Sequence, residues 1–256
     1  MGRQIVAMRA GVSGMTGSKG RFRDGLMLLM RQGTIDGMMA GIFQMTFMIE
    51  TGAVRVVISS QGLLREFRSK PSGRDYAVAG TPVPVMHAVC RGVATPLHSL
   101  TREGDLIRAQ FLDSEVRATV RVSPRKHHIL FEIVDVQPAG VEELTLRFPV
   151  RRLATVGGAF NATYDGQFGI CLLGVTENTY QQTVSHGADV LSLSARCTGK
   201  HGMAGARFAL VAAERYLFEA AIMETERENG LPCPMLEGKW ARVSEPVRRS
   251  YLFMVD

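Results

Sequence analysis

The chain has 256 residues, of which 46% are hydrophobic and 21% are charged, so it can bury a large core and wholesale disorder is excluded. The net charge is +6, but residues 1–74 hold 11 Lys and Arg against 4 Asp and Glu, whereas the remaining residues hold 19 against 20. A basic excess at one end, without a recognition-helix, zinc-finger or RNA-binding motif, does not indicate nucleic-acid binding. No apolar stretch reaches the roughly 18 residues of a transmembrane helix, so no membrane span is predicted.

Residues 1–41 are unlike the rest of the chain. They are rich in methionine and glycine and lack strand alternation. Their longest clear apolar run, Leu26 to Met30, is stopped by Arg31, and it is shorter than the roughly 7–15 residues of a secretory signal core. We interpret residues 1–41 as a flexible or misannotated extension, which leaves a cytoplasmic or extracytoplasmic location open.

Residues 42–213 contain short segments of alternating apolar and polar residues, separated by turn residues such as Pro71-Ser72-Gly73. Alternation with period two places one side of a strand in the core and the other in water. The pattern predicts a mainly-β fold, a large antiparallel β-sandwich over 42–213 followed by one helix, a linker and a terminal strand. The residues predicted to face inward are Val116, Ala118, Val120, Val122, Ile129, Phe131, Ile133, Leu144, Leu146, Phe148, Val150, Leu191, Leu193 and Ala195. In "HHILFEIVDV" the other face also carries Leu130 and Val134, which a second sheet would partly cover.

Residues 214–250 follow a different pattern. "ERYLFEAAIMETERENG" predicts a helix with Leu217, Phe218, Ala221 and Ile222 on one buried face, and Gly230 is a natural residue to end it. A proline-rich linker would continue to residue 250. Residues 251–256, "YLFMVD", are typical of a strand buried on both faces in a parallel sheet.

Sequence motifs for a nucleophile elbow, a phosphate loop, a dinucleotide site or a zinc protease are absent. His127 and His128 are adjacent and would point to opposite faces of a strand, so they do not predict a shared metal, and neither a metal nor another cofactor is expected. Asp75 and Asp165 fall at turns, where a carboxylate usually accepts hydrogen bonds from nearby backbone amides. Asn161-Ala162-Thr163 fits the N-glycosylation pattern, which matters only in a secreted eukaryotic protein.

The cysteines, Cys90, Cys171, Cys197 and Cys233, lie far apart. Their spacing matches no zinc motif, and it leaves one or two disulfides open. Cys171, in the apolar run "FGICLLGV", is expected to be a buried small hydrophobic residue.

A family resemblance rests on two stretches of this sequence. The run "NGLPCPMLEGKWARVSEPVRRSYLFMVD" resembles the junction in large bacterial glycoside-hydrolase-type proteins between an N-terminal galactose-mutarotase-like β-sandwich and a (β/α)8 barrel. The turn Gly73-Arg74-Asp75-Tyr76 resembles an early hairpin of such sandwiches, whereas Cys233 stands where a histidine is expected. The resemblance implies a fragment that ends at the first barrel strand, with the catalytic carboxylates in the missing barrel domain. Only Asp256 would be a marginal catalytic candidate.

The leading hypothesis is therefore a non-catalytic sandwich region of a carbohydrate-active enzyme, with carbohydrate and the missing barrel domain as partners. One alternative is a free-standing carbohydrate-binding module, in which Trp240 could stack on a sugar, although its position in the linker favours a role in anchoring the linker to the sandwich. The other is a self-contained mutarotase-like or lyase-like enzyme that transfers protons with a histidine and a carboxylate. His87, His98 and His186 are its candidates, and their convergence on one groove beside an Asp or Glu would favour it.

Overall fold

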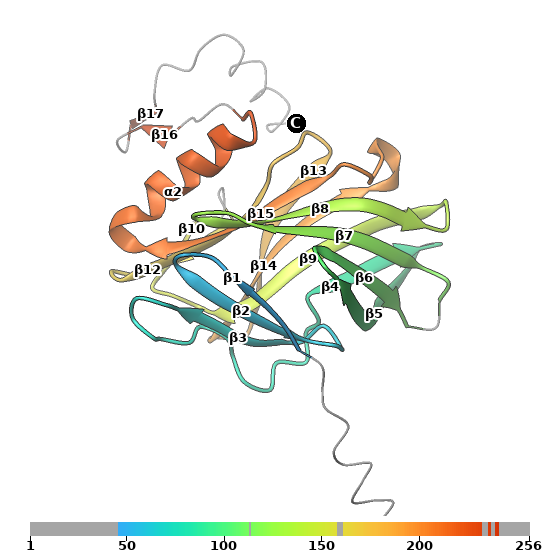
Figure 1. Ribbon diagram of the computed structural model, residues 1–256, viewed down its shortest axis with the longest axis horizontal. Helices are drawn as coiled ribbons and strands as arrows, with labels where there is room; N and C mark the ends of the chain where they lie inside the picture. Colours follow the sequence, from blue (N-terminus) through green and yellow to red (C-terminus); the bar gives the residue numbers. More distant parts are fainter. Residues whose placement is uncertain (1–45, 113, 158–160, 232–234, 237–238, 241–256) are drawn as a thin grey trace, which may run out of the picture. The chain divides into compact units, whose positions relative to one another are not determined.

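The computed structural model describes residues 46–112, 114–157, 161–231, 235–236 and 239–240, all within the unit 44–256. These residues form large antiparallel sheets and one α-helix near the C-terminal end of the described part, α2 (Arg215–Glu228) (Figure 1). The predicted mainly-β fold with one following helix is confirmed. No helix in the described ranges has the length and apolar character that crossing a membrane requires.

A three-stranded sheet opens the described part of the chain. It consists of β1 (Thr46–Glu50), β2 (Val54–Ser59) and β3 (Leu64–Ser69), paired antiparallel in that order. Its inward side chains, among them Phe47, Val56 and Phe67, belong to the same hydrophobic core as the larger sheet. The small sheet is therefore an integral layer of the sandwich.

The second sheet has twelve strands, and each pairs antiparallel with its neighbours. In spatial order the strands are β10 (Thr155–Gly157), β11 (Ala162–Tyr164), β12 (Phe168–Gly174), β15 (Arg207–Glu214), β8 (His128–Gln137), β7 (Arg117–Pro124), β6 (Leu106–Phe111), β5 (Val93–Glu103), β4 (Met86–Cys90), β9 (Val141–Arg151), β14 (Val190–Thr198) and β13 (Thr179–His186). A short 3-10 turn, Gly199–His201, follows β14.

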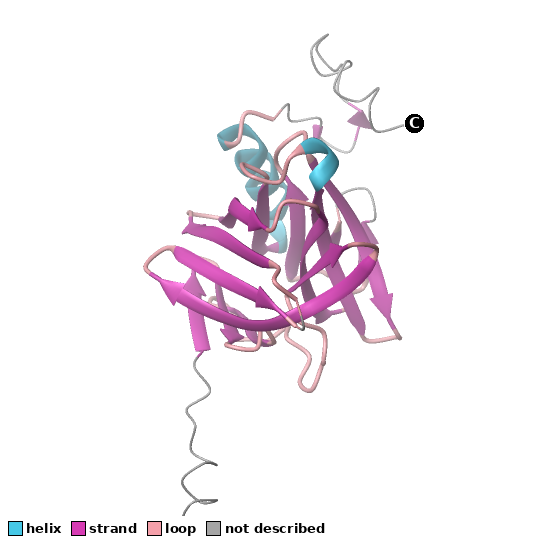
Figure 2. Ribbon diagram, turned by 90° about the vertical axis from the view of Figure 1, so that its right-hand side faces the viewer, coloured by secondary structure: helices cyan, strands magenta, loops and turns pink. Residues whose placement is uncertain are grey.

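Strand β5 folds this sheet into two layers. Its first part pairs with β4, its second part pairs with β6, and the register shifts between Leu97 and Ser99. A strand that passes from one layer to the other at a bend or bulge forms a corner of a sandwich. Figure 2 shows that strands of this fold run in clearly different directions.

Asn161 joins the two ends of the folded sheet. Its Nδ2 donates hydrogen bonds to the carbonyl oxygen of Leu172 in β12 (2.7 Å) and to that of Ser194 in β14 (2.9 Å). Its Oδ1 accepts a hydrogen bond from the Thr183 hydroxyl of β13 (3.1 Å). The residue is 0% exposed and adopts φ of 48°, a conformation that asparagine tolerates better than most residues. A buried amide with these partners leaves no room for a glycan, so the glycosylation pattern at this position has no role in the folded chain.

The main core fills the space between the layers. All fourteen side chains predicted to face inward in the alternating segments are buried there. The contacts include Phe131 with Phe148, whose ring centroids lie 5.7 Å apart, and Tyr76 stacked on Phe168 at 4.7 Å.

Helix α2 covers the outer face of β12 and β15 and forms a second, smaller core (Figure 1). Both strands are buried on both faces, which explains their continuous apolar sequences. Phe218, Ala221 and Ile222 face the sheet as predicted, but Leu217 is 38% exposed, so its predicted burial is wrong. Leu130 packs against this helix cluster, whereas the sequence had suggested a second sheet over that side of its strand.

The helix ends as the sequence predicts. Gly230 follows it with φ of 75°, and its N–H donates to the carbonyl oxygen of Arg227. Beyond it, β16 (Met235–Leu236) pairs with β17 (Lys239–Trp240) inside the predicted linker. The predicted extension 1–41 and terminal strand 251–256 lie outside the described residues.

Candidate functional site

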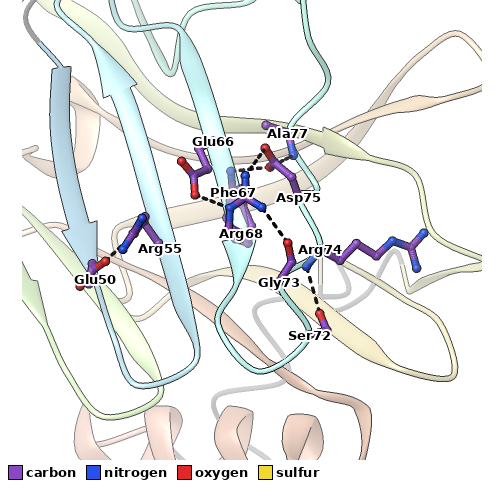
Figure 3. Close-up of polar contacts among 10 residues, drawn as sticks. All are labelled: Glu50, Arg55, Glu66, Phe67, Arg68, Ser72, Gly73, Arg74, Asp75 and Ala77. Atoms are coloured by element: carbon purple, nitrogen blue, oxygen red, sulfur yellow. Dashed lines mark hydrogen bonds and ion pairs between the residues drawn. The ribbon is translucent and has the colours of Figure 1, made fainter.

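The two turn aspartates have the structural role predicted for them. The Oδ1 atom of Asp75 accepts hydrogen bonds from the backbone N–H groups of Phe67 (2.9 Å) and Ala77 (3.0 Å) (Figure 3). The Oδ1 atom of Asp165 likewise accepts from the N–H groups of Gln167 and Phe168, at 2.8 and 2.9 Å. Carboxylates engaged in this way order the backbone of their turns.

The adjacent histidines dock helix α2. His127 Nε2 lies 3.2 Å from Glu224 Oε2, and His128 Nδ1 lies 3.1 Å from the Thr225 hydroxyl. Both rings therefore contact the same helix, and the prediction that they point to opposite faces is wrong. His127 precedes β8, so strand alternation does not govern its direction. No group of three or more His, Cys, Asp or Glu side chains suited to a metal ion occurs in the part of the chain that is described.

A small pocket lies on the side of β4, β9, β14 and β13 that faces away from the core. Its volume is about 110 Å³. The pocket brings together His87 and His186, two of the three histidines proposed for proton transfer, whereas His98 is exposed on β5 and is not among the lining residues. The lining side chains with polar or charged groups include His87, Glu143, Arg147, Gln182, His186 and Arg196.

Strand register assembles these residues from separate parts of the sequence. His87 of β4 pairs with Thr145 of β9, Thr145 pairs with Arg196 of β14, and Arg196 pairs with Tyr180 of β13. Because alternate residues share a face, Glu143 and Arg147 lie on the same side of β9 as Thr145. The outward-facing residues of four neighbouring strands thus meet at the pocket. On this side of β14, Ser192 and Ser194 are both buried.

Glu143 is held by two neighbours. Its Oε1 accepts a hydrogen bond from the Thr145 hydroxyl (2.7 Å), and its Oε2 lies 2.8 Å from Arg196 Nη1. His87 Nε2 lies 3.9 Å from Glu143 Oε1, which exceeds a hydrogen-bond distance. The carboxylate of Glu143 therefore pairs with Arg196 and makes no direct hydrogen bond to His87.

The environment of His87 lowers the pKa of its imidazole. Burial first, and then the nearby charge of Arg147, lower the pKa of the imidazole, while Glu143 opposes that shift. Its Nδ1 is buried and has no hydrogen-bond partner. A neutral imidazole with an unsatisfied nitrogen can donate or accept one hydrogen bond, depending on its tautomer.

Arg147 carries a positive charge that is not paired with a carboxylate of the described residues. Its Nε donates a hydrogen bond to the carbonyl oxygen of Pro84 (2.8 Å). Burial lowers the pKa of its guanidinium, but an arginine stays protonated in proteins. Among the described residues, no Asp or Glu oxygen lies within 4.0 Å of its nitrogens.

An exposed aromatic ring borders the pocket. Tyr180 is 46% exposed, and the Arg196 guanidinium carbon lies 6.0 Å from its ring centroid. Tyr180 lies on the same side of β13 as Gln182 and His186, since these positions alternate along the strand. The patch therefore combines hydrogen-bonding groups with one accessible apolar face.

The remaining sequence candidates lie elsewhere. Trp240, in β17, pairs through its backbone with Met235 of β16. Asp256 lies outside the described residues. Cys90, Cys171 and Cys197 are free thiols, and Cys171 is buried as predicted. Glu143, Arg147 and Arg196 were not among the site residues predicted from the sequence. The available signal was their outward position in alternating strands, which gives no indication of which strands are neighbours.

The chain matches no protein-family model, and no curated protein matches it significantly.

Proposed function

We propose that this chain is the sandwich region of a carbohydrate-active protein of the glycoside-hydrolase type, and that the His87 pocket contacts the sugar. The observation that carries this proposal is the pocket itself, a concave group of hydrogen-bonding side chains beside the exposed ring of Tyr180. Ligand sites typically combine a few well-placed polar groups with apolar contact area. A tyrosine presents an apolar ring with a polar tip, which suits the face of a sugar ring.

The sandwich is proposed to bind the sugar without hydrolysing it. Glycoside hydrolysis canonically uses two carboxyl groups that flank the scissile bond. Of the described residues that line the pocket, Glu143 is the one carboxylate, and Arg196 and Thr145 both engage it. In this proposal, catalysis belongs to a barrel domain outside this sequence.

The test is a glycan-array screen of the full 256-residue chain, followed by calorimetry with the best ligand. Tyr180→Ala should weaken binding about fivefold, since a lost stacking contact costs on the order of 1 kcal/mol. Tyr216→Ala is the matched control, because Tyr216 is 77% exposed on α2 and lies outside the pocket. Absence of binding to any glycan, or equal losses in the two variants, would refute the proposal.

DNA sequence beyond the codon for Asp256 tests the link to a barrel domain. An open reading frame that continues with alternating strand and helix patterns favours the hypothesis that the sandwich supports a catalytic barrel. A stop codon favours a free-standing binding module that uses the same pocket.

A second candidate function is proton transfer on a sugar, as in a mutarotase-like or lyase-like enzyme. The specific observation that favours it is the presence of His87 and His186 in one pocket, with Glu143 3.9 Å from His87. A catalytic base near neutral pH is most often a histidine. The chain would then accelerate anomer interconversion measured by NMR, and His87→Ala would abolish this acceleration. His98→Ala is the control, because His98 is exposed and outside the pocket; an equal rate with and without protein excludes the activity.

A further inference from the structure

We infer that the sugar bound in the His87 pocket carries an anionic oxygen group, a carboxylate, phosphate or sulfate, that pairs with Arg147. This inference rests on the proposed sugar-binding function and specifies the class of sugar. It depends on three features of the pocket: the charge balance of the lining residues, the half-buried Arg147 side chain and the unsatisfied Nδ1 of His87.

The charge balance leaves one cation in excess. Glu143 supplies the single negative charge among the described lining residues, and Arg196 approaches it at 2.8 Å. That pair neutralises itself, so the charge of Arg147 remains. Its contact with the Pro84 carbonyl oxygen satisfies one guanidinium N–H but adds no negative charge.

An uncompensated, partly buried cation is costly. Removing a charged group from water is energetically unfavourable unless a partner of opposite charge compensates it. The lowered pKa of Arg147 has burial as its cause and no carboxylate that opposes it. A bound anion would restore the missing partner, and the planar guanidinium can hold a carboxylate or phosphate through two parallel hydrogen bonds.

His87 offers a further contact to the same group. His87 lines the pocket, its Nδ1 is buried without a hydrogen-bond partner, and burial lowers the pKa of the ring. In one of its tautomers, this nitrogen donates a hydrogen bond, which an anionic oxygen can accept. A pocket of about 110 Å³ matches an acidic substituent and part of the ring that carries it. Gln182 lines the pocket, and Tyr180, two positions earlier on the same side of β13, is available for the rest of the sugar.

The experiment is isothermal titration calorimetry of the full chain with four sugars. Glucose is the neutral reference, and glucuronate, glucose 6-phosphate and glucose 6-sulfate distinguish the three sources of charge. At 20 mM NaCl, at least one anionic sugar should bind ten times or more tightly than glucose. Raising NaCl to 200 mM should reduce this preference, because salt screens charge pairs at the protein surface.

Arg147→Gln should reduce the ratio of anionic-sugar to neutral-sugar affinity towards one. Arg147→Lys keeps the charge but loses the planar pair of hydrogen-bond donors, so it should retain part of the preference. Arg152→Gln is the control, since Arg152 is an exposed arginine near β13 that does not line the pocket. Circular dichroism and thermal unfolding establish that each variant is folded. The salt dependence of the wild-type chain tests the inference even if the Arg147 variants do not fold.

The outcomes separate this inference from the proposed function. Equal affinity for glucose and all three anionic sugars, or a preference that Arg147→Gln leaves intact, overturns the inference and leaves sugar binding standing. Arg147-dependent binding of free acetate or inorganic phosphate without binding of any sugar supports the anion site and refutes the proposed function. Absence of binding by sugars and free anions refutes both.

Discussion

The ring of Phe218 lies directly against Gly169, so closely that a Cβ atom added to Gly169 would come within 2.4 Å of it. Gly169 belongs to β12 and Phe218 to α2, so this contact sets how near the helix approaches the sheet. Phe218 is 3% exposed and part of the smaller core, whose other members include Cys171, Val211 and Ala221. The packing of the helix therefore requires glycine at this position.

Gly169→Ala should destabilise the chain by about 1–3 kcal/mol, the usual cost of overpacking a filled core. The added methyl group has no space unless Phe218 or the helix moves. Urea unfolding followed by circular dichroism measures the loss. Gly166→Ala, three positions earlier, is the control, because no atom lies within 4 Å of its added Cβ. Similar stability for the two variants would contradict the packing described for α2.

Asn161→Ala should cost about 2–4 kcal/mol, because it leaves buried carbonyl and hydroxyl groups without partners on three strands. The same change at Asn178, whose side chain makes one exposed hydrogen bond to the Gly202 carbonyl oxygen, should cost less than about 1 kcal/mol. Thermal unfolding of both variants gives the comparison. If Asn161→Ala were the milder change, the amide would not be what joins the ends of the sheet.

The stability of the chain should fall as the pH drops below about 6.5, because of His128. Burial lowers the pKa of this histidine in the folded state from its ordinary value of 6.5, and Glu228 opposes the shift only in part. The unfolded chain therefore binds a proton at a higher pH than the folded chain does. The stability contribution is complete above pH 6.5 and is lost as the pH falls towards the lowered folded pKa.

Urea unfolding at pH 7.5 and 5.5 measures this effect. His128→Gln should show a smaller loss of stability between these two pH values than the wild-type chain, and His98→Gln should behave like the wild type because His98 is exposed. The range stays above the pH at which carboxylates titrate. An unchanged pH dependence in His128→Gln would exclude this histidine as the source.

The described cysteines should differ in their reactivity. Burial raises the pKa of Cys197 to about 12, and it raises the pKa of Cys171 as well, so neither forms a thiolate at neutral pH. Cys90 is half-buried and free. Treatment with N-ethylmaleimide at pH 7.5, read by peptide mass spectrometry, should modify Cys90 and leave the other two unmodified until urea is added. Rapid labelling of Cys171 in the native chain would show that α2 opens.

The sequence predicted strands and buried faces well, because burial on one side of a strand imposes a period of two. Val120 in β7 and Leu193 in β14 are examples, and each lies at 2% exposure or less. The helix was predicted equally well, from the spacing of its apolar residues and from Gly230 as the residue that ends it. Leu217 was misplaced because the buried stripe of α2 is narrower than the apolar stripe of its sequence.

The pocket could not be predicted in the same way. Alternation shows that Glu143 and Arg147 point away from the core, but it says nothing about which strand lies beside β9. Pairing with β4 and β14 brings His87 and Arg196 to these residues, and β4 is separated from β9 in the sequence by four strands. Such long-range arrangements leave no local pattern in the sequence.

The insertion of β5 to β8 between β4 and β9 has a consequence for how the chain folds. Met86 pairs with Leu146, and four strands lie between them in the sequence. Such distant pairings form slowly, because the intervening chain loses conformational entropy before the contacts stabilise it. The hairpins β5–β6, β6–β7 and β7–β8 join strands that follow one another in sequence, so they can form locally and early. A nascent chain that has formed only these hairpins has His87 without Glu143 or Arg147. The pocket is complete only after β9 has paired with β4 and β14, and β14 with β13.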